Sequence, residues 1–199
     1  MSFFARFAQN RGALVGLIIL LVIIAMAILA PLLFPESPWR MVQRPFLPPL
    51  SQDGFPLGTD TMGRNVASGL MHGAWVSLLI GLVSTSVALL IGVPLGAIAG
   101  YYGGIIDDVL MRFTEFFQTI PNFALAIVLV AIMQPSITSI VLAIAIVSWP
   151  PVARLVRAEF MSLRNREYVE AARLVGQSNT TIILRQILPN TVVSGFGRS

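Results

Sequence analysis

The sequence predicts an all-α protein, a polytopic bundle of transmembrane helices with four complete spans and the start of a fifth. Composition is the first reason, since 56% of the 199 residues are hydrophobic and only 11% are charged, as is typical of proteins embedded in a bilayer. The second reason is that the charges are concentrated between long apolar stretches. Most of this chain is therefore expected to be surrounded by lipid.

The first span is predicted from Leu14 to Phe34, an uncharged stretch that follows Arg6 and Arg11. A span needs about 20 mostly apolar residues, and this run is longer than the roughly 7 to 15 apolar residues of a signal-peptide core. We therefore expect a retained anchor, so that residues 1–35 comprise a cytoplasmic N-terminus and the first transmembrane helix.

A proline-rich loop, residues 36–73, follows the first span and is expected on the external side. Its prolines exclude a long helix or a central strand, and they include Pro45, Pro48, Pro49 and Pro56. The loop ends in GTDTMGRNVASGLMHGAWVSLLIG, where Asp60 or Thr59 caps a following helix while Gly58 and Gly63 permit tight turns. We expect this amphipathic segment to lie on the membrane as a capped helix.

The second and fourth spans are predicted at about Ala74–Ala99 and Ile137–Ala153. The second carries Pro94, which a membrane helix tolerates when neighbours satisfy the freed carbonyl. The fourth is expected to end at residues 149–151, WPP, with Trp149 as an aromatic anchor at the interface. Two arginines mark the end of this span, Arg154 and Arg157.

The third span is interrupted. Arg112 precedes the apolar run from Phe123 to Met133, and an arginine at the bilayer centre costs roughly 2.5 to 3.5 kcal/mol on the insertion scale. Arg112 is therefore expected at an interface, with the helix entering the bilayer near Phe113 and bending at Pro121 and Asn122.

The arginines predict the orientation of the chain. With the N-terminus in the cytoplasm, nine arginines face inward and three outward, which agrees with the positive-inside rule. The inward set is Arg6, Arg11, Arg112, Arg154, Arg157, Arg164, Arg166, Arg173 and Arg185, the outward set is Arg40, Arg44 and Arg64, and Arg198 is unassigned. This bias accounts for the net charge of +4 without a nucleic-acid partner.

Several classes of chemistry are excluded by composition. All thirteen positive charges are arginine, so the chain lacks the lysine of a P-loop and of a Schiff-base enzyme. It has no cysteine and one histidine, His72, which excludes disulfides, thiolate nucleophiles and a histidine cluster. We expect no catalytic residue, no cofactor and no metal site, and the chain is not expected to be an enzyme.

Residues 167–190, EYVEAARLVGQSNTTIILRQILPN, form the most distinctive polar stretch. A helix from Glu167 to Val175 would place four residues on one apolar face, namely Tyr168, Ala171, Ala172 and Val175. Arg166, Glu170 and Arg173 would lie on another face, where Glu170 pairs with either arginine for a few tenths of a kcal/mol.

A sharp turn and a second helix are predicted to follow. Gly176 supplies the left-handed position that ends the first helix, and Ser178 or Asn179 caps the second. The second helix would bring three apolar side chains together, Ile183, Leu184 and Ile187, before Pro189 stops it. The stretch from Ile182 to Phe196 is too short and too polar for a complete span, so the chain is expected to stop inside a fifth helix.

This stretch resembles the EAA motif of the membrane subunits of bacterial ABC importers, in which Glu170-Ala171-Ala172 is followed at matching spacing by Gly176 and Leu188-Pro189. Further segments resemble the C-type permease of the dipeptide, oligopeptide and nickel import group; they are GTDTMGRN with GAWVSLLIG, YYGGIIDDVLMR, IPNFALAI and REYVEAARLVG. The resemblance extends from Ala13 to Asn190. Two positions depart from it, because Gln186 stands where isoleucine is usual and Asn65 where aspartate is usual.

The resemblance implies a multi-pass protein of the bacterial inner membrane, with a permease core at residues 74–199 that is truncated at its C-terminus and a coupling segment at residues 155–189. Its partners would be a second permease subunit, two cytoplasmic ATP-binding subunits, an extracytoplasmic solute-binding protein and membrane lipid. Peptides are the first expectation for the solute, with nickel and glutathione-like cargo open.

The resemblance also implies roles for single residues. The elbow would dock into a cleft on the ATPase, where Glu170 meets a basic group, Ala171 and Ala172 permit close seating, and Gly176 sets the bend. The coupling set is completed by Leu188 and Pro189, with Arg166, Tyr168 and Arg173 in support.

Other interpretations stay open. The elbow could rest on lipid headgroups as an amphipathic helix, and the prolines Pro94, Pro121 and Pro150 are either hinges or static kinks. The charged residues at the start of the third span, Asp107, Asp108, Arg112 and Glu115, are interfacial anchors or an ion relay. The alternatives for the whole chain are a non-functional truncated permease fragment and an ion-coupled secondary carrier.

Overall fold

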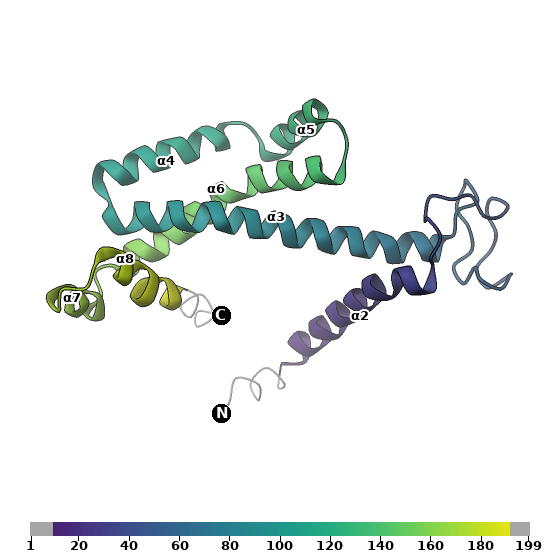
Figure 1. Ribbon diagram of the computed structural model, residues 1–199, viewed down its shortest axis with the longest axis horizontal. Helices are drawn as coiled ribbons and strands as arrows, with labels where there is room; N and C mark the ends of the chain where they lie inside the picture. Colours follow the sequence, from purple (N-terminus) through teal and green to yellow (C-terminus); the bar gives the residue numbers. More distant parts are fainter. Residues whose placement is uncertain (1–9, 192–199) are drawn as a thin grey trace. The chain divides into compact units, whose positions relative to one another are not determined.

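The computed structural model describes residues 10–191, and the chain divides into two compact units, residues 1–80 and 81–199. Within the described range the regular elements are all helices, which confirms the all-α class (Figure 1). Three of them are long and apolar enough to cross a membrane: α2 (Arg11–Leu33), α3 (Val66–Tyr102) and α6 (Ile137–Leu163). A bent pair, α4 (Gly104–Thr119) and α5 (Asn122–Met133), makes a fourth if it counts as one span.

Helix α2 of the first unit begins three residues before the predicted span. The Asn10 side chain caps it by accepting a hydrogen bond from the Ala13 N–H at 3.2 Å. Among the residues of α2 only Ala27 and Ala30 are buried, so its large side chains are free to meet lipid or another helix. Residues 1–9 and 192–199, which include Arg6, Arg198 and the end of the predicted fifth helix, lie outside the described residues.

The α2–α3 loop, residues 34–65, is held by hydrogen bonds that begin and end within it. The Thr59 hydroxyl donates to the Arg44 carbonyl at 2.7 Å and accepts from the Leu47 N–H at 2.9 Å. The Asp60 carboxylate accepts from the N–H groups of Met62 and Arg64 at 2.8 and 2.9 Å. These contacts fold a proline-rich segment without regular structure.

The cap of α3 is Asn65 rather than the predicted Asp60 or Thr59. Its side-chain oxygen accepts from the N–H groups of Ala67 and Ser68 at 3.0 and 3.3 Å. The predicted caps are already engaged inside the loop. Asparagine caps a helix about as well as aspartate does, so the cap tolerates this departure from the expected residue.

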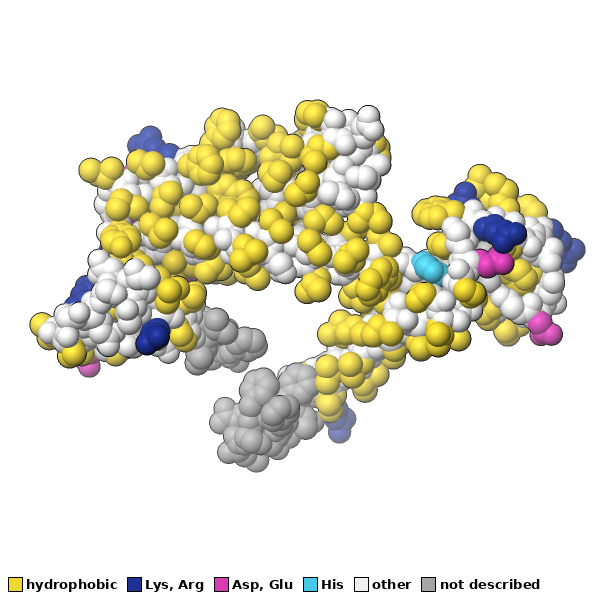
Figure 2. All heavy atoms as spheres, in the orientation of Figure 1, with side chains coloured by type: hydrophobic (Ala, Val, Ile, Leu, Met, Phe, Trp, Pro, Cys, Tyr) yellow, Lys and Arg dark blue, Asp and Glu magenta, His cyan; other side chains and the backbone are white. Residues whose placement is uncertain are grey.

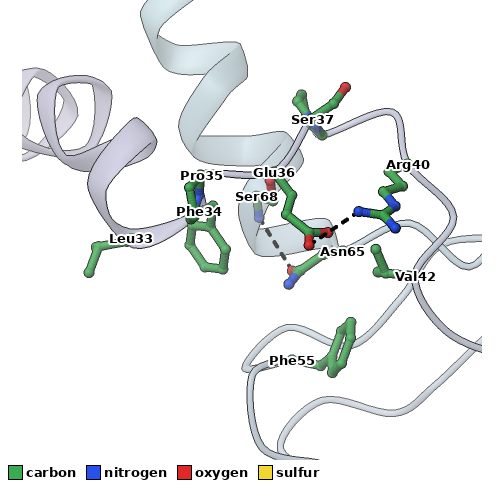
Figure 3. A pocket seen from close by; sticks show the side chains of 11 residues that line it. Leu33, Phe34, Pro35, Glu36, Ser37, Arg40, Val42, Phe55, Asn65 and Ser68 are labelled. Carbon is green, nitrogen blue, oxygen red and sulfur yellow. Dashed lines mark hydrogen bonds and ion pairs between the residues drawn. The ribbon is translucent and has the colours of Figure 1, made fainter.

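A small hollow of about 180 Å³ lies where the end of α2, the loop and the start of α3 meet (Figure 3). Phe34 and Phe55 give it apolar walls, and Asn65 lies on its floor. The Glu36–Arg40 ion pair, 3.3 Å between Oε1 and Nη1, spans its edge with both side chains more than half exposed. A pair this exposed contributes about 0 to 1 kcal/mol.

Helix α3 is continuous over 37 residues, so the amphipathic segment before Ala74 is not a separate helix on the membrane. The residues between Val66 and Pro94 include glycine but no other helix breaker, and glycine is tolerated in membrane helices. Pro94 lies inside the helix without ending it. The predicted span Ala74–Ala99 is therefore the inner part of a longer element.

The predicted bend in the third span is confirmed. Helix α4 ends at Thr119 and α5 begins at Asn122, with a bend of 76° between them. Ile120 and Pro121 are extended, as expected for a proline and the residue before it. Both arms of this bent pair pack along α6.

Helix α6 continues to Leu163 through Pro150 and Pro151, past Ala153, where the fourth span was predicted to end. Trp149 is also not an interfacial anchor, because it is 4% exposed and its ring stacks on Phe113 at 5.8 Å and meets Phe117 edge-on at 5.3 Å. Aromatic packing of this kind joins α4 to α6.

Glycines permit α3 and α6 to lie in backbone contact within the second unit. A Cβ at Gly92 would lie 2.8 Å from the Trp149 carbonyl oxygen, and one at Gly100 would lie 2.6 Å from that of Arg157. The residues recur at every fourth position on both helices: Gly92, Gly96 and Gly100 against Trp149, Ala153 and Arg157. Small residues at this spacing are typical of helix contacts in membranes. Hydrophobic side chains cover much of the visible surface of α4–α6 (Figure 2).

Candidate functional site

The polar segment after α6 forms a helical elbow, which we define as residues 164–191. Its first arm is α7 (Glu167–Leu174), and its second arm comprises α8 (Asn179–Thr181), the π-helix η1 (Ile182–Ile187) and helical residues up to Thr191. Figure 1 shows α7 and α8 beside the C-terminal end of α6. The two predicted arms and the turn between them are therefore present.

The first arm carries its charges where the helix dipole favours them. Glu167 and Glu170 lie in the first turn of α7 and Arg173 lies in the last. Glu170 makes none of the ion pairs within 4.0 Å among the described residues, so its predicted pairing with Arg166 or Arg173 is wrong. The Glu170 carboxylate is exposed and available to a partner.

The buried face of α7 differs from the predicted one. Val169 is fully buried and Ala172 is 7% exposed, whereas Val175 is 82% exposed and Tyr168 is 37% exposed. The side that faces inward packs against η1 and joins one hydrophobic cluster with it. The spacing of apolar residues within eight positions did not distinguish this side from the other. Because Leu174 is also 88% exposed, the arm ends in an apolar tip of two residues, Leu174 and Val175.

The turn between the arms is a Schellman motif centred on Gly176. The Gly176 N–H donates to the Arg173 carbonyl at 3.0 Å, and the Gln177 N–H donates to the Ala172 carbonyl at 3.1 Å. Gly176 has a φ of +80°, the left-handed region that glycine adopts without steric cost. This confirms the predicted role of Gly176 in ending the helix.

The second arm begins at Ser178, whose side chain accepts from the Thr181 N–H at 3.3 Å. Wide π-helical turns follow, in which the Leu188 N–H donates to the Ile183 carbonyl. The helix continues through Pro189 to Thr191, so the prediction that Pro189 stops it is wrong. Asn190 donates from its side-chain amide to the Gln186 carbonyl at 2.7 Å, which satisfies a backbone acceptor next to the proline.

The elbow is attached to the helices by a hydrophobic cluster that we call the elbow core. It joins the ends of α3 and α6 to both arms; its buried members are Ala97, Tyr101, Phe160, Leu163, Val169, Ala172, Ile182 and Ile187. Of the predicted group, Ile187 is fully buried and Ile183 packs against the core, whereas Leu184 is 55% exposed, so that part of the prediction is wrong. The fully buried Ile182 takes the place expected for Leu184. The elbow is therefore part of the packed second unit.

Two segments of the chain match models of known protein families. Residues 92–194, which include the C-terminal end of α3, the helices α4 to α6 and the elbow, match the model for the binding-protein-dependent transport system inner membrane component. Residues 2–49 match the N-terminal transmembrane domain of oligopeptide transport permease C.

The chain belongs to the family of binding-protein-dependent transport system inner membrane components. It is 38% identical over 194 residues to the dipeptide transport system permease protein DppC of Haemophilus influenzae and 40% identical to the di/tripeptide transport system permease protein DppC of Pseudomonas aeruginosa. It is 34% identical over 191 residues to the oligopeptide transport system permease protein OppC of Bacillus subtilis. These matches cover 95% of this chain and 66%, 64% and 62% of those relatives.

In this inner membrane component the predicted coupling residues do not share one surface. Those on the outside of the elbow are Arg166, Tyr168, Glu170, Ala171, Arg173, Gly176 and Pro189. Ala172 is buried in the elbow core, and Leu188 is half-buried against it. The small size of Ala172 therefore serves packing within the chain. Gln186, the departure from the family pattern, donates to the Gln177 side chain across the turn at 3.3 Å.

An ion pair that the sequence did not predict joins α4 and α6. Asp107 is 6% exposed and binds Arg157 through two contacts, Oδ1 to Nε at 2.5 Å and Oδ2 to Nη2 at 2.6 Å. Asp107 is thus neither a free relay group nor an anchor at the surface. The two residues are fifty positions apart, and no sequence pattern connects them. A cavity of about 520 Å³ adjoins the pair and is lined mainly by charged side chains, including Asp108, Arg112, Glu115 and Arg154.

Proposed function

We propose that this chain is the membrane-spanning permease subunit of an ATP-driven importer, in which a separate ATPase subunit hydrolyses ATP and moves the elbow. Membership of the family supports the role in transport. The chemistry would be carried out by the partner, because this chain contains no lysine for a P-loop of its own.

The observation that carries the proposal is the contrast between the two sides of the elbow. Its outer side presents Glu170 and the apolar tip of Leu174 and Val175, while its inner side is rooted in the elbow core. Two large apolar side chains exposed together in a polar segment offer apolar area that a protein partner would bury. An element that is exposed on one side and packed against α3 and α6 on the other is suited to transmit movement into the membrane helices.

The proposal includes partners and cargo. We propose assembly with a second permease, two cytoplasmic ATP-binding subunits and a solute-binding protein on the outer face of a bacterial inner membrane, with the N-terminus in the cytoplasm. The excess of arginine on the elbow side supports this orientation. The names of the relatives, which refer to dipeptides, tripeptides and oligopeptides, support peptides as the solute. Identification of the ligand that co-purifies with the solute-binding protein tests the cargo.

Docking is tested by crosslinking in the assembled transporter. The chain contains no cysteine, so a single Val175→Cys substitution places one reactive group at the tip of the elbow. We expect it to capture the ATPase subunit. Leu32→Cys, at the C-terminal end of α2 and 78% exposed, is the matched control and should capture none. Equal capture at both positions, or none at Val175, would contradict the proposal.

Coupling is tested by substitutions that change the elbow without touching the spans. Glu170→Lys reverses the charge offered to the ATPase, and Gly176→Pro removes both the left-handed turn and the N–H donor to Arg173. Both variants should insert into the membrane yet lose uptake per ATP hydrolysed. Gly176→Asn is the matched control, because asparagine tolerates the left-handed conformation. Full uptake by Gly176→Pro would contradict the proposal.

The alternative of an ion-coupled carrier makes the opposite prediction. Vesicles that hold the complex, a proton or sodium gradient and no nucleotide should show no uptake if the chain is an importer permease. Uptake under these conditions would favour the carrier instead.

A further inference from the structure

The C-terminal end of α3 carries a buried tyrosine that neither the motif nor the proposed docking surface uses. Tyr101 is 6% exposed and belongs to the elbow core. Its hydroxyl donates to the side-chain oxygen of Asn179 at 2.9 Å. The guanidinium carbon of Arg173 lies 5.4 Å from the centre of its ring, within the range of a cation–π contact.

These two contacts lie on opposite sides of the elbow turn. Arg173 is in the last turn of α7, Asn179 begins α8, and Gly176 separates them. One side chain of α3 therefore holds both arms of the elbow at once. The contacts join residues that are 72 to 78 positions apart in the chain, so they are tertiary links rather than local caps.

We propose that Tyr101 is the positioning residue that connects the elbow to α3, so that displacement of the elbow by the ATPase displaces the end of this helix. The inference rests on the proposed function and adds to it the route by which movement enters the membrane. Tyr101 touches neither solute nor nucleotide and acts through Arg173 and Asn179.

The C-terminal end of α3 is in close contact with the end of α6 and the start of the elbow. Gly100, the preceding residue, has no space for a side chain, because a Cβ there would lie 2.6 Å from the Phe160 Cβ. The Arg164 side chain, at the start of the elbow, donates to the Gly100 carbonyl at 3.1 Å. Close packing resists compression, so the contacts of Tyr101 and Gly100 pass a shift of the elbow on to the helix backbone.

The chain offers a series of variants that separate the two links. Tyr101→Phe keeps the ring under Arg173 and removes only the hydrogen bond, and Asn179→Ala removes the same hydrogen bond from the other side. Tyr101→Leu removes both links while keeping an apolar group in the core. Tyr102 is the matched control, because it is 47% exposed and, among the described residues, the ring contact found for it is with Tyr101, edge-on at 5.2 Å.

The test measures uptake per ATP hydrolysed in the reconstituted transporter, together with ATPase capture by Val175→Cys in each variant. A hydrogen bond and a cation–π contact together correspond to about a fivefold to thirtyfold change in the equilibrium that they bias. Tyr101→Leu should therefore lower uptake per ATP by at least about fivefold while capture of the ATPase stays within about twofold. Tyr102→Leu should leave both quantities near those of the unaltered chain.

A double-mutant cycle adds a readout that general damage to packing would not reproduce. Tyr101→Phe and Asn179→Ala should each lower the coupling ratio, and the double variant should be no worse than either one. Additive losses, or an unchanged ratio in Tyr101→Leu with capture retained, would overturn the inference and leave the proposed function standing. Failure of Val175→Cys to capture the ATPase in the otherwise unaltered chain would overturn the proposed function and this inference with it.

Discussion

The α2–α3 loop and the elbow are both turned by glycines of positive φ, yet they are stabilised in different ways. The loop is held by contacts among its own residues, including those of Thr59 and Asp60 and the bridge between Met41 and Arg64. The elbow adds to its local caps a buried core and a hydrogen bond across 78 positions. The comparison shows that similar turn chemistry can make either a self-contained loop or a rigid extension of a helix bundle.

Removing a buried phenylalanine should expose this difference most strongly. Phe160→Ala empties a fully buried position in the elbow core and should cost about 3 to 5 kcal/mol of the free energy of unfolding. Phe46→Ala, in the loop and 72% exposed, should cost within about 0.5 kcal/mol. Thermal unfolding in detergent measures both, and faster tryptic cleavage after Arg173 reports loss of the elbow in particular. Equal destabilisation by the two changes would contradict the comparison.

The two kinds of turn should also differ in their tolerance of a methyl group. In Gly176→Ala the added Cβ would have no atom within 4 Å. The cost to the free energy of unfolding is then the strain of positive φ alone, about 1 to 2 kcal/mol. Gly58→Ala adds to the same strain an overlap with the Leu47 carbonyl oxygen, for roughly 1 to 3 kcal/mol more. The melting temperature of the Gly58 variant should be the lower one. The reverse order would mean that the loop yields more readily than its hydrogen bonds imply.

Ion pairs sharpen the same contrast between local and tertiary contacts. Asp107→Asn leaves the Arg157 guanidinium, which is 33% exposed, without its carboxylate and should cost roughly 1 to 3 kcal/mol. Glu36→Gln in the loop breaks a pair that is mostly exposed and should cost about 0 to 1 kcal/mol. Added salt should reduce the second effect more than the first. A Glu36 variant that is the less stable of the two would contradict this ranking.

Acid should weaken the loop through one carboxylate. The hydrogen bond from the Arg64 N–H holds the pKa of Asp60 below its ordinary value. The ionised carboxylate therefore stabilises the loop in full above about pH 4, the ordinary pKa of aspartate, and this contribution is lost as the pH falls through the lower folded pKa.

Trp39 lies 5.3 Å from the Arg64 guanidinium and can report this change. In a chain in which Trp75 and Trp149 are replaced by phenylalanine, its fluorescence should change as the pH falls below about 4 and stay constant between about pH 6 and 8. Asp60→Asn should abolish the acid transition. A transition of the same size in that variant would assign it to another group.

The sequence by itself determined the features that depend on solvent and on local backbone rules. A helix that crosses a bilayer needs about 20 apolar residues. The positions of α2, α3 and α6 were therefore predicted from the sequence, and the structure differs from the prediction in where these helices begin and end. The bend at Pro121 and the turn at Gly176 were also predicted. Proline restricts φ at its own position, and glycine permits positive φ at its own position.

Only the tertiary structure decided which surfaces meet. The buried side of α7, the continuation of α6 through Pro150 and Pro151, that of the second arm through Pro189, and the burial of Trp149 all depend on what packs beside them. The same holds for the partner of Asp107 and for the two contacts of Tyr101, which join residues 50 to 78 positions apart. The sequence of a helix shows which side chains are apolar or charged. Which residue each side chain contacts depends on how all the helices of the unit pack together.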